Sequence, residues 1–117
     1  METVECPNEL CFKKTMALRD ALDLLGGKWK LCLIHNLNNY GTMRFKDLMT
    51  AIADISPKVL SKELQDLEEN MMVKRTVNNT KPVTVSYTLT EHAKVTIPVI
   101  NSLLDFGLKH RRKIIEK

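Results

Sequence analysis

The sequence has no features that would indicate a membrane or secreted protein. No run of apolar residues approaches the roughly 18 that are needed to span a bilayer. The first ten residues contain three acids and no basic residue, so they do not resemble a secretory signal. We therefore expect a cytoplasmic protein without a membrane partner.

Cysteine is scarce and odd in number. Cys6, Cys11 and Cys32, in a compartment expected to be reducing, predict no disulfide framework. Cys32 stands in an apolar stretch, residues 29–34, and is predicted to be a small buried core residue. Cys6 and Cys11 lie five apart with no histidine or third cysteine nearby, which is a weak pattern for a metal site. We expect no bound metal and no cofactor.

Catalytic motifs are absent as well. The sequence has no nucleophile elbow, no phosphate-binding loop and no paired His-x-x-x-His site. His35, His92 and His110 stand in separate predicted elements, where a lone histidine is more often a capping or core residue than a catalyst. The sequence therefore predicts a protein that is not an enzyme.

The bulk composition is that of one ordinary globular domain. A chain of 117 residues is too short for two independent cores, and 44% hydrophobic with 27% charged residues excludes a disordered chain. The net charge of +4 permits an anionic partner. Five lysines and arginines gather in residues 109–117, which indicates either a solvated helix end or a phosphate-binding segment.

Apolar spacing predicts four helices in the first 70 residues, at 14–25, 28–38, 44–51 and 57–70. The second is apolar around nearly its whole circumference, so it is predicted to be central and buried. Phe45 and Leu48 face inward from the short third helix. Ser56 is predicted to cap the fourth helix, with Pro57 at its first position.

Beyond residue 70 the apolar period changes from helix to strand. Residues 72–77 and 83–89 are predicted strands joined by a polar turn, which makes a hairpin over about 72–89. Thr90 is predicted to cap a final helix, about 91–115, in which Pro98 indicates a kink or a later start. This order predicts an α+β, mainly α fold: a winged helix-turn-helix with the hairpin as its wing and with added N- and C-terminal helices.

The fourth predicted helix has a polar face of the kind that reads DNA. Leu60, Leu64, Leu67 and Met71 form a narrow core stripe. The opposite face offers two cations, an amide and a hydroxyl, which contact phosphates and base edges in a major groove. These groups belong to Lys58, Lys62, Gln65 and Ser61. The four acids Glu63, Asp66, Glu68 and Glu69 oppose DNA binding, although they cluster in the C-terminal half of the helix. An ordinary amphipathic surface helix would show the same polar face.

The hairpin and the two preceding helices add further candidates. The wing carries basic residues and a polar tip that could reach a minor groove, although an exposed hairpin kept soluble by charge would look alike. The start of the third helix is also basic. Besides the four residues of the fourth helix, the predicted DNA-binding residues are Arg44, Lys46, Ser56, Pro57, Lys74, Arg75, Asn78, Asn79 and Lys81.

Five segments together resemble the HxlR family of bacterial winged-helix regulators, relatives of the MarR-type regulators. They are LGGKWK (25–30), RFKDL (44–48), ISPKVLSKELQDLE (55–68), KPVTVSYTLTEHA (81–93) and the stretch 98–107, within a match over about 21–110. The resemblance implies a dimeric repressor or activator that binds an inverted repeat in double-stranded DNA and so associates with the nucleoid. The helix from Pro57 would be the recognition helix, in a single HxlR-type domain over 14–117 that follows a flexible extension, 1–13. A protein-interaction module on the same fold is the alternative.

The resemblance also implies that the first and last helices form the dimer interface. On the final helix Ile97, Leu104 and Leu108 share one face, whereas Val99, Leu103 and Phe106 lie on the other. We expect the chain's own core to cover the first face and a second copy to cover the other. The predicted interface residues are Leu18, Leu22, Val99, Leu103 and Phe106. A twofold dimer would set the recognition helices roughly 34 Å apart.

One departure from the family concerns its redox-sensing members, several of which carry a reactive cysteine where Met16 stands here. Cys6 or Cys11 could serve instead, since Lys13 and Lys14 would lower a thiol pKa. An unknown small-molecule effector, or no signal beyond dimer binding, are the other interpretations.

Overall fold

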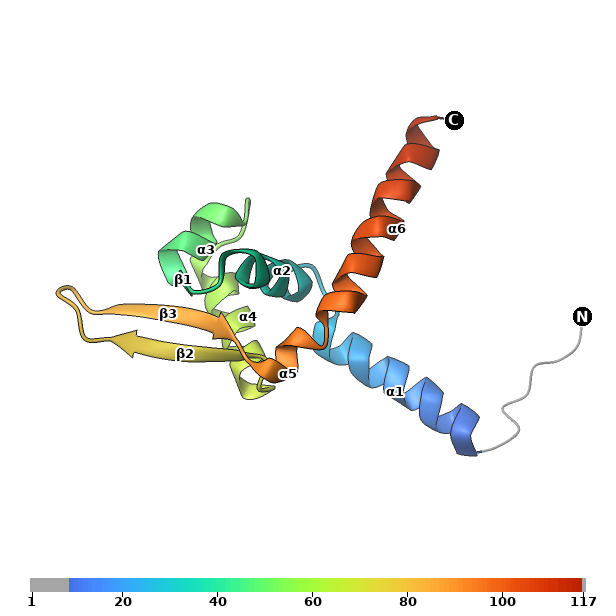
Figure 1. The fold of residues 1–117 in the computed structure, drawn as a ribbon, viewed down its shortest axis with the longest axis horizontal. Coiled ribbons are helices and arrows are strands. Elements are labelled where there is room, and N and C mark those ends of the chain that lie inside the picture. Colours follow the sequence, from blue (N-terminus) through green and yellow to red (C-terminus); the bar gives the residue numbers. More distant parts are fainter. Residues whose placement is uncertain (1–8, 117) are drawn as a thin grey trace, which may run out of the picture.

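Helices and strands follow the predicted order in the computed structural model, which describes residues 9–116 (Figure 1). The elements are α1 (Glu9–Leu25), α2 (Lys30–Tyr40), β1 (Met43–Arg44), α3 (Phe45–Ala51), α4 (Pro57–Glu69), β2 (Val73–Asn78), β3 (Thr84–Leu89), α5 (Glu91–Lys94) and α6 (Ile97–Ile115). The predicted α+β, mainly α winged helix-turn-helix is therefore confirmed.

Both terminal helices differ in their bounds from the prediction. Helix α1 begins at Glu9, so residues 9–13, expected in a flexible extension, are helical, while residues 1–8 lie outside the described part. The predicted final helix is two helices, since α5 ends at Lys94 and α6 starts at Ile97. Pro98 stands in the first turn of α6, where its missing amide proton is not needed. The later start that Pro98 indicated is thus the observed one.

The sheet has three antiparallel strands in the order β1-β3-β2. Strands β2 and β3 pair from Val73–Leu89 to Asn78–Thr84 and form the long hairpin in Figure 1. Strand β1 was not predicted, because two residues give no alternating pattern; Met43 and Arg44 pair with Tyr87 and Ser86 of β3. The predicted hairpin is confirmed as a wing, and β1 joins the middle of its strand β3 to α3.

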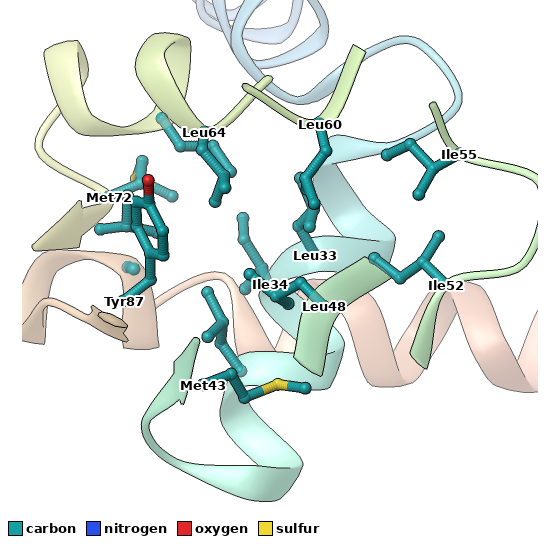
Figure 2. Packing of buried hydrophobic residues seen from close by; sticks show 14 of the residues in the cluster. Leu33, Ile34, Met43, Leu48, Ile52, Ile55, Leu60, Leu64, Met72 and Tyr87 are labelled. Atoms are coloured by element: carbon teal, nitrogen blue, oxygen red, sulfur yellow. The ribbon is translucent and has the colours of Figure 1, made fainter. Parts of the chain in front are cut away.

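The core lies between α2, α3, α4 and the sheet. Figure 2 shows Leu60 and Leu64 of α4 directed toward the side chains of α2 and β3. The most deeply buried large side chains are Leu33, Ile34, Leu37, Leu48, Leu60, Leu64, Leu67 and Met72. This confirms Leu60, Leu64 and Leu67 as the core stripe of α4. Helix α2 contributes Leu33, Ile34 and Leu37 to the core, but the predicted burial around nearly its whole circumference was wrong.

Met71 and Cys32 were wrongly predicted to lie in the core. Met71, placed in the α4 stripe, is 70% exposed, because the helix ends at Glu69 and Met71 has a positive φ of 61° that turns the chain. Met72 takes its place in the core. Cys32 is exposed rather than buried, because α2 is covered on only part of its circumference.

A turn of two glycines separates α1 from α2. A side chain at Gly26 would collide with the carbonyl of Leu22, whose oxygen accepts a hydrogen bond from the Gly26 amide at 2.7 Å. Gly27 has a φ of 90°, which disfavours any residue with a side chain. Both glycines are therefore required for the abrupt change of direction between the helices.

An ion pair joins α2 to α4. The Nζ of Lys30 lies 2.6 Å from Oε2 of Glu63 and 3.5 Å from Oδ2 of Asp66. The hydrogen bond to Glu63, with the charges of both carboxylates, raises the pKa of Lys30 above 10.5, although desolvation acts in the opposite direction. The side chains of Lys30 and Glu63 are only 13% and 17% exposed. The pair therefore acts where water screens it poorly.

Helices α1 and α6 project from this core (Figure 1). No residue of α1 is buried, and Ile100 is the buried residue of α6. Leu104 and Leu108, predicted to be covered by the chain's own core, are 45% and 61% exposed. The radius of gyration is 17.8 Å, whereas a compact domain of this length would have about 13 Å. Both helices thus leave apolar side chains uncovered.

We predict that Leu60→Ala lowers the free energy of unfolding by about 3 kcal/mol, because it empties a fully buried site. Urea unfolding followed by circular dichroism at fixed protein concentration measures this. Val83→Ala, at an exposed wing position, is the control and should change stability by less than about 0.5 kcal/mol. Equal effects of the two substitutions would contradict the packing of α4.

The ion pair gives stability a predictable pH dependence. Because the folded-state pKa of Lys30 is raised, the stability difference between wild type and Lys30→Met should be constant below pH 10.5 and decline above it. Urea unfolding from neutral to alkaline pH tests this. Lys94→Met, which removes an exposed pair with Glu91, is the matched control. A difference that increases with alkaline pH would show that Lys30 is not stabilised in its charged form.

Candidate nucleic-acid interface

The N-terminus of α4 is shaped by two of the predicted site residues. The Oγ of Ser56 accepts a hydrogen bond from the Val59 amide at 3.1 Å, and Pro57 occupies the first turn. Ser56 has an extended backbone with φ −84° and ψ 155°, as a capping residue requires. These two residues set where the helix begins, and thereby which side chains its first turns present.

The predicted reading face of α4 is solvent-accessible. Lys58, Ser61, Lys62 and Gln65 are all exposed. Glu63 and Asp66, two of the four acids that oppose DNA binding, lie on another flank, where both contact the single charge of Lys30. Glu69 accepts a long hydrogen bond of 3.4 Å from the Gln65 amide and, with Glu68, stays exposed near the C-terminal end. The N-terminal half of the face therefore carries positive charge without a competing acid.

A hollow of about 260 Å³ separates α4 from the wing. We call it the wing hollow; it is lined by Ser61, Leu64, Gln65 and Glu68 of α4 and by Arg75 and Tyr87 of the wing strands. Three predicted site residues, from two elements, are thus brought to one place. The sequence did not predict Tyr87 as a site residue. It reaches the wing hollow because the strand register pairs it with Arg75, and the sequence does not show that register.

The predicted wing residues separate into three groups. Lys74 and Arg75 are consecutive in β2, so their side chains leave opposite faces of the strand, and Arg75 is the one beside α4. Asn78 ends β2, and its amide donates to Oγ1 of Thr84 at 3.1 Å and to Oγ of Ser86 at 3.3 Å, so it braces the hairpin. Asn79 and Lys81 are exposed at the turn.

The two residues predicted on α3 lie at its start. Arg44 belongs to β1, and its backbone amide donates to Oδ2 of Asp47 at 3.0 Å, which caps α3. Lys46 follows in the first turn, and the side chains of both basic residues are exposed. The pairing of Arg44 with Ser86 sets this helix start beside the middle of β3.

The predicted interface residues on α1 and α6 are all exposed: Leu18, Leu22, Val99, Leu103 and Phe106. Beside them lies an almost wholly apolar groove between α2 and α6, lined by Leu31, Cys32, His35, Ile100, Leu103 and Leu104. Cys32, predicted as core, is therefore at the edge of this uncovered surface.

Cys11 lies in α1 next to the exposed Lys13 and Lys14, whereas Cys6 is outside the described residues. Thiol sensing and an effector both stay predictions. Within residues 9–116 no group of three or more histidines, cysteines and acids is arranged to hold a metal. No helix in that range is long and apolar enough to cross a membrane.

Comparison with known proteins agrees with this geometry. The model of the HxlR-like helix-turn-helix family matches residues 24–114. The uncharacterized HTH-type transcriptional regulator BH0655 of Halalkalibacterium halodurans is 38% identical over 77% of this chain and 80% of its own. The HTH-type transcriptional regulator YodB of Bacillus subtilis is 42% identical over 72% of this chain and 70% of its own.

A solved structure shows the same likeness. The redox regulator HypR in its reduced form has a TM-score of 0.79 and 28% identity, with 86% of this chain and 99% of the other covered. The family match, the related sequences and the shared winged helix all agree, and the chain is therefore a member of the HxlR-like helix-turn-helix family of transcriptional regulators.

Proposed function

We propose that the protein is a sequence-specific DNA-binding regulator that acts as a homodimer on an inverted-repeat operator. The observation that carries this proposal is the arrangement of α4 and the wing. The first turns of α4 expose Lys58 and Lys62, while Ser61 and Gln65 of the same helix border the wing hollow together with Arg75. On the flank, Lys30 pairs with Glu63 and Asp66. A surface helix whose charges only keep the protein soluble would not need its lysines on one face and its acids paired on another.

The protein would make two kinds of contact with DNA, to phosphates and to base edges. Arg44, Lys46, Lys74 and Lys81 would supply contacts to phosphates, which strengthen binding to any sequence and weaken as salt rises. Lys58, Ser61, Lys62 and Gln65 would enter the major groove, where amide and cationic side chains distinguish base edges. Arg75 would join the two groups, because it borders the same hollow as Ser61 and Gln65.

The homodimer is supported by the apolar surfaces of α1 and α6. Both helices project from the core with exposed leucines and, on α6, an exposed phenylalanine. Exposed apolar side chains of this size, next to the apolar groove between α2 and α6, are typical of an association site. A second copy would cover it on both chains at once, since a twofold axis uses the same surface on each.

DNA binding is tested by fluorescence anisotropy across a salt series. The probe is the DNA upstream of the protein's own gene, and a scrambled duplex is the control. Wild type should bind the upstream duplex more tightly, and Lys58→Ala/Gln65→Ala should lose most of that preference, because it removes a cation and an amide from the reading face. A matched Lys94→Ala/Asn39→Ala variant, altered at exposed residues of α5 and α2, should retain it.

The alternative outcomes separate the candidate functions. Equal weak binding to both duplexes by wild type, persisting across a genomic fragment library, would contradict sequence-specific regulation. A protein-interaction module would behave in this way, and neutralising Lys58, Lys62 and Arg75 would then leave its nucleic-acid affinity unchanged.

The dimer is tested by sedimentation velocity. Leu22→Glu/Phe106→Glu should shift the protein toward monomer and weaken operator binding together, because it places charge in the proposed interface of both helices. Val83→Glu, an equally polar change at an exposed wing residue, should leave the sedimentation coefficient unchanged. A wild type that sediments as a monomer at all accessible concentrations would remove the dimer from the proposal.

A further inference from the structure

The contact between Lys30 and α4 lies outside the predicted DNA-binding face. Lys30 is the first residue of α2, and its Nζ reaches Glu63 at 2.6 Å and Asp66 at 3.5 Å. These carboxylates lie one helical turn apart on the flank of α4 away from the wing hollow. Lys30 is only 13% exposed, so it holds the recognition helix from inside the domain.

The leucine stripe of α4 sets which face of the helix is buried, and the ion pair on one flank adds a directional contact that constrains its rotation and tilt more narrowly. Apolar contacts are non-directional, whereas a short charge-assisted hydrogen bond fixes both distance and direction. The other ion pairs of residues 9–116 are each formed within a single helix: Glu91–Lys94 within α5 and Asp105–Lys109 within α6. Within that range, the Lys30 pair is therefore the ionic link between two helices.

Lys30 also stands where α1 meets α4. A hollow of about 280 Å³ is bordered by Lys30, by Asp20, Asp23 and Leu24 of α1, and by Asp66 and Asn70 of α4. Helix α1 enters α2 through the Gly26–Gly27 turn, three residues before Lys30. The same lysine thus contacts the recognition helix at the point where the proposed dimer helix joins the domain.

We propose that Lys30 is a positioning residue for DNA reading, whose bond to Glu63 fixes the orientation of α4 relative to α1 and α2. This inference rests on the proposed function, in which the two recognition helices of a dimer bind the two half-sites of one operator. A helix that is free to rotate or tilt would still meet phosphates but would no longer align its side chains with base edges. Loss of the pair therefore reduces discrimination between sequences more than it reduces binding to DNA as such.

The test compares affinities for the upstream duplex and the scrambled duplex in the full-length protein. Lys30→Met and Glu63→Gln should each reduce the ratio of the two affinities by roughly tenfold, and the double variant should lose little more, because both remove one coupled pair. Lys30→Arg keeps the donor and the charge and should retain most of the ratio. Lys94→Met, which removes an exposed lysine paired within α5, should leave it unchanged.

A second readout separates positioning from stability. On duplexes whose half-site spacing is lengthened or shortened by one base pair, wild type should prefer one spacing sharply, and Lys30→Met should bind all spacings more evenly. Thermal unfolding and sedimentation of each variant confirm a folded dimer. If Lys30→Met does not fold, Glu63→Gln is the variant that should lose the preference, and Lys30→Arg is the one that should keep it.

Two results would overturn the inference. One is an unchanged affinity ratio and spacing preference in folded Lys30→Met and Glu63→Gln. The other is an equal loss of affinity for both duplexes that follows the loss of thermal stability, which is the behaviour of a residue with a structural role alone. Failure of the proposed function looks different, because wild type itself would then show no preference between the duplexes.

Discussion

The burial of three leucines on one side of α4 is the constraint on which the rest of the structure depends. Leu60, Leu64 and Leu67 are fully buried, and the side chains around them come from α2, α3 and the sheet. Once this stripe faces the core, the opposite face of α4 must face solvent. The position of the wing follows too. Met72, three residues beyond the end of α4, is buried in the same core, and β2 starts directly after it.

Local sequence signals predicted most of this fold. Ser56 and Pro57 marked the start of α4, Thr90 marked the start of α5, and the change from helical to alternating spacing located the wing. Each of these features depends on residues within a few positions of one another, so the sequence displays them directly. The candidate DNA-contact residues of α4 were predictable for the same reason, since their common face follows from the helical period.

What the sequence could not predict depends on contacts between distant segments. Strand β1 exists through its pairing with β3, and Tyr87 reaches the wing hollow through its register with Arg75. From the sequence, Glu63 was expected to oppose DNA binding. In the structure it pairs with Lys30 of α2, which is 33 residues away along the chain. Asn78 looked like a free polar tip, yet it bonds to the facing strand. In each case the role is set by a partner that no spacing rule identifies.

Helix α1 has a consequence for how the molecule folds. It is 17 residues long and has no fully buried residue; Leu24 and Leu25, at its C-terminal end, pack against the core. Most helical stability in proteins comes from such packing rather than from the isolated helix. Association in the proposed dimer would therefore stabilise the N-terminal turns of α1, so that folding of this arm and assembly would be coupled. The helix content of the chain would then increase with its own concentration, and a freshly made, dilute protein would differ in conformation from an abundant one.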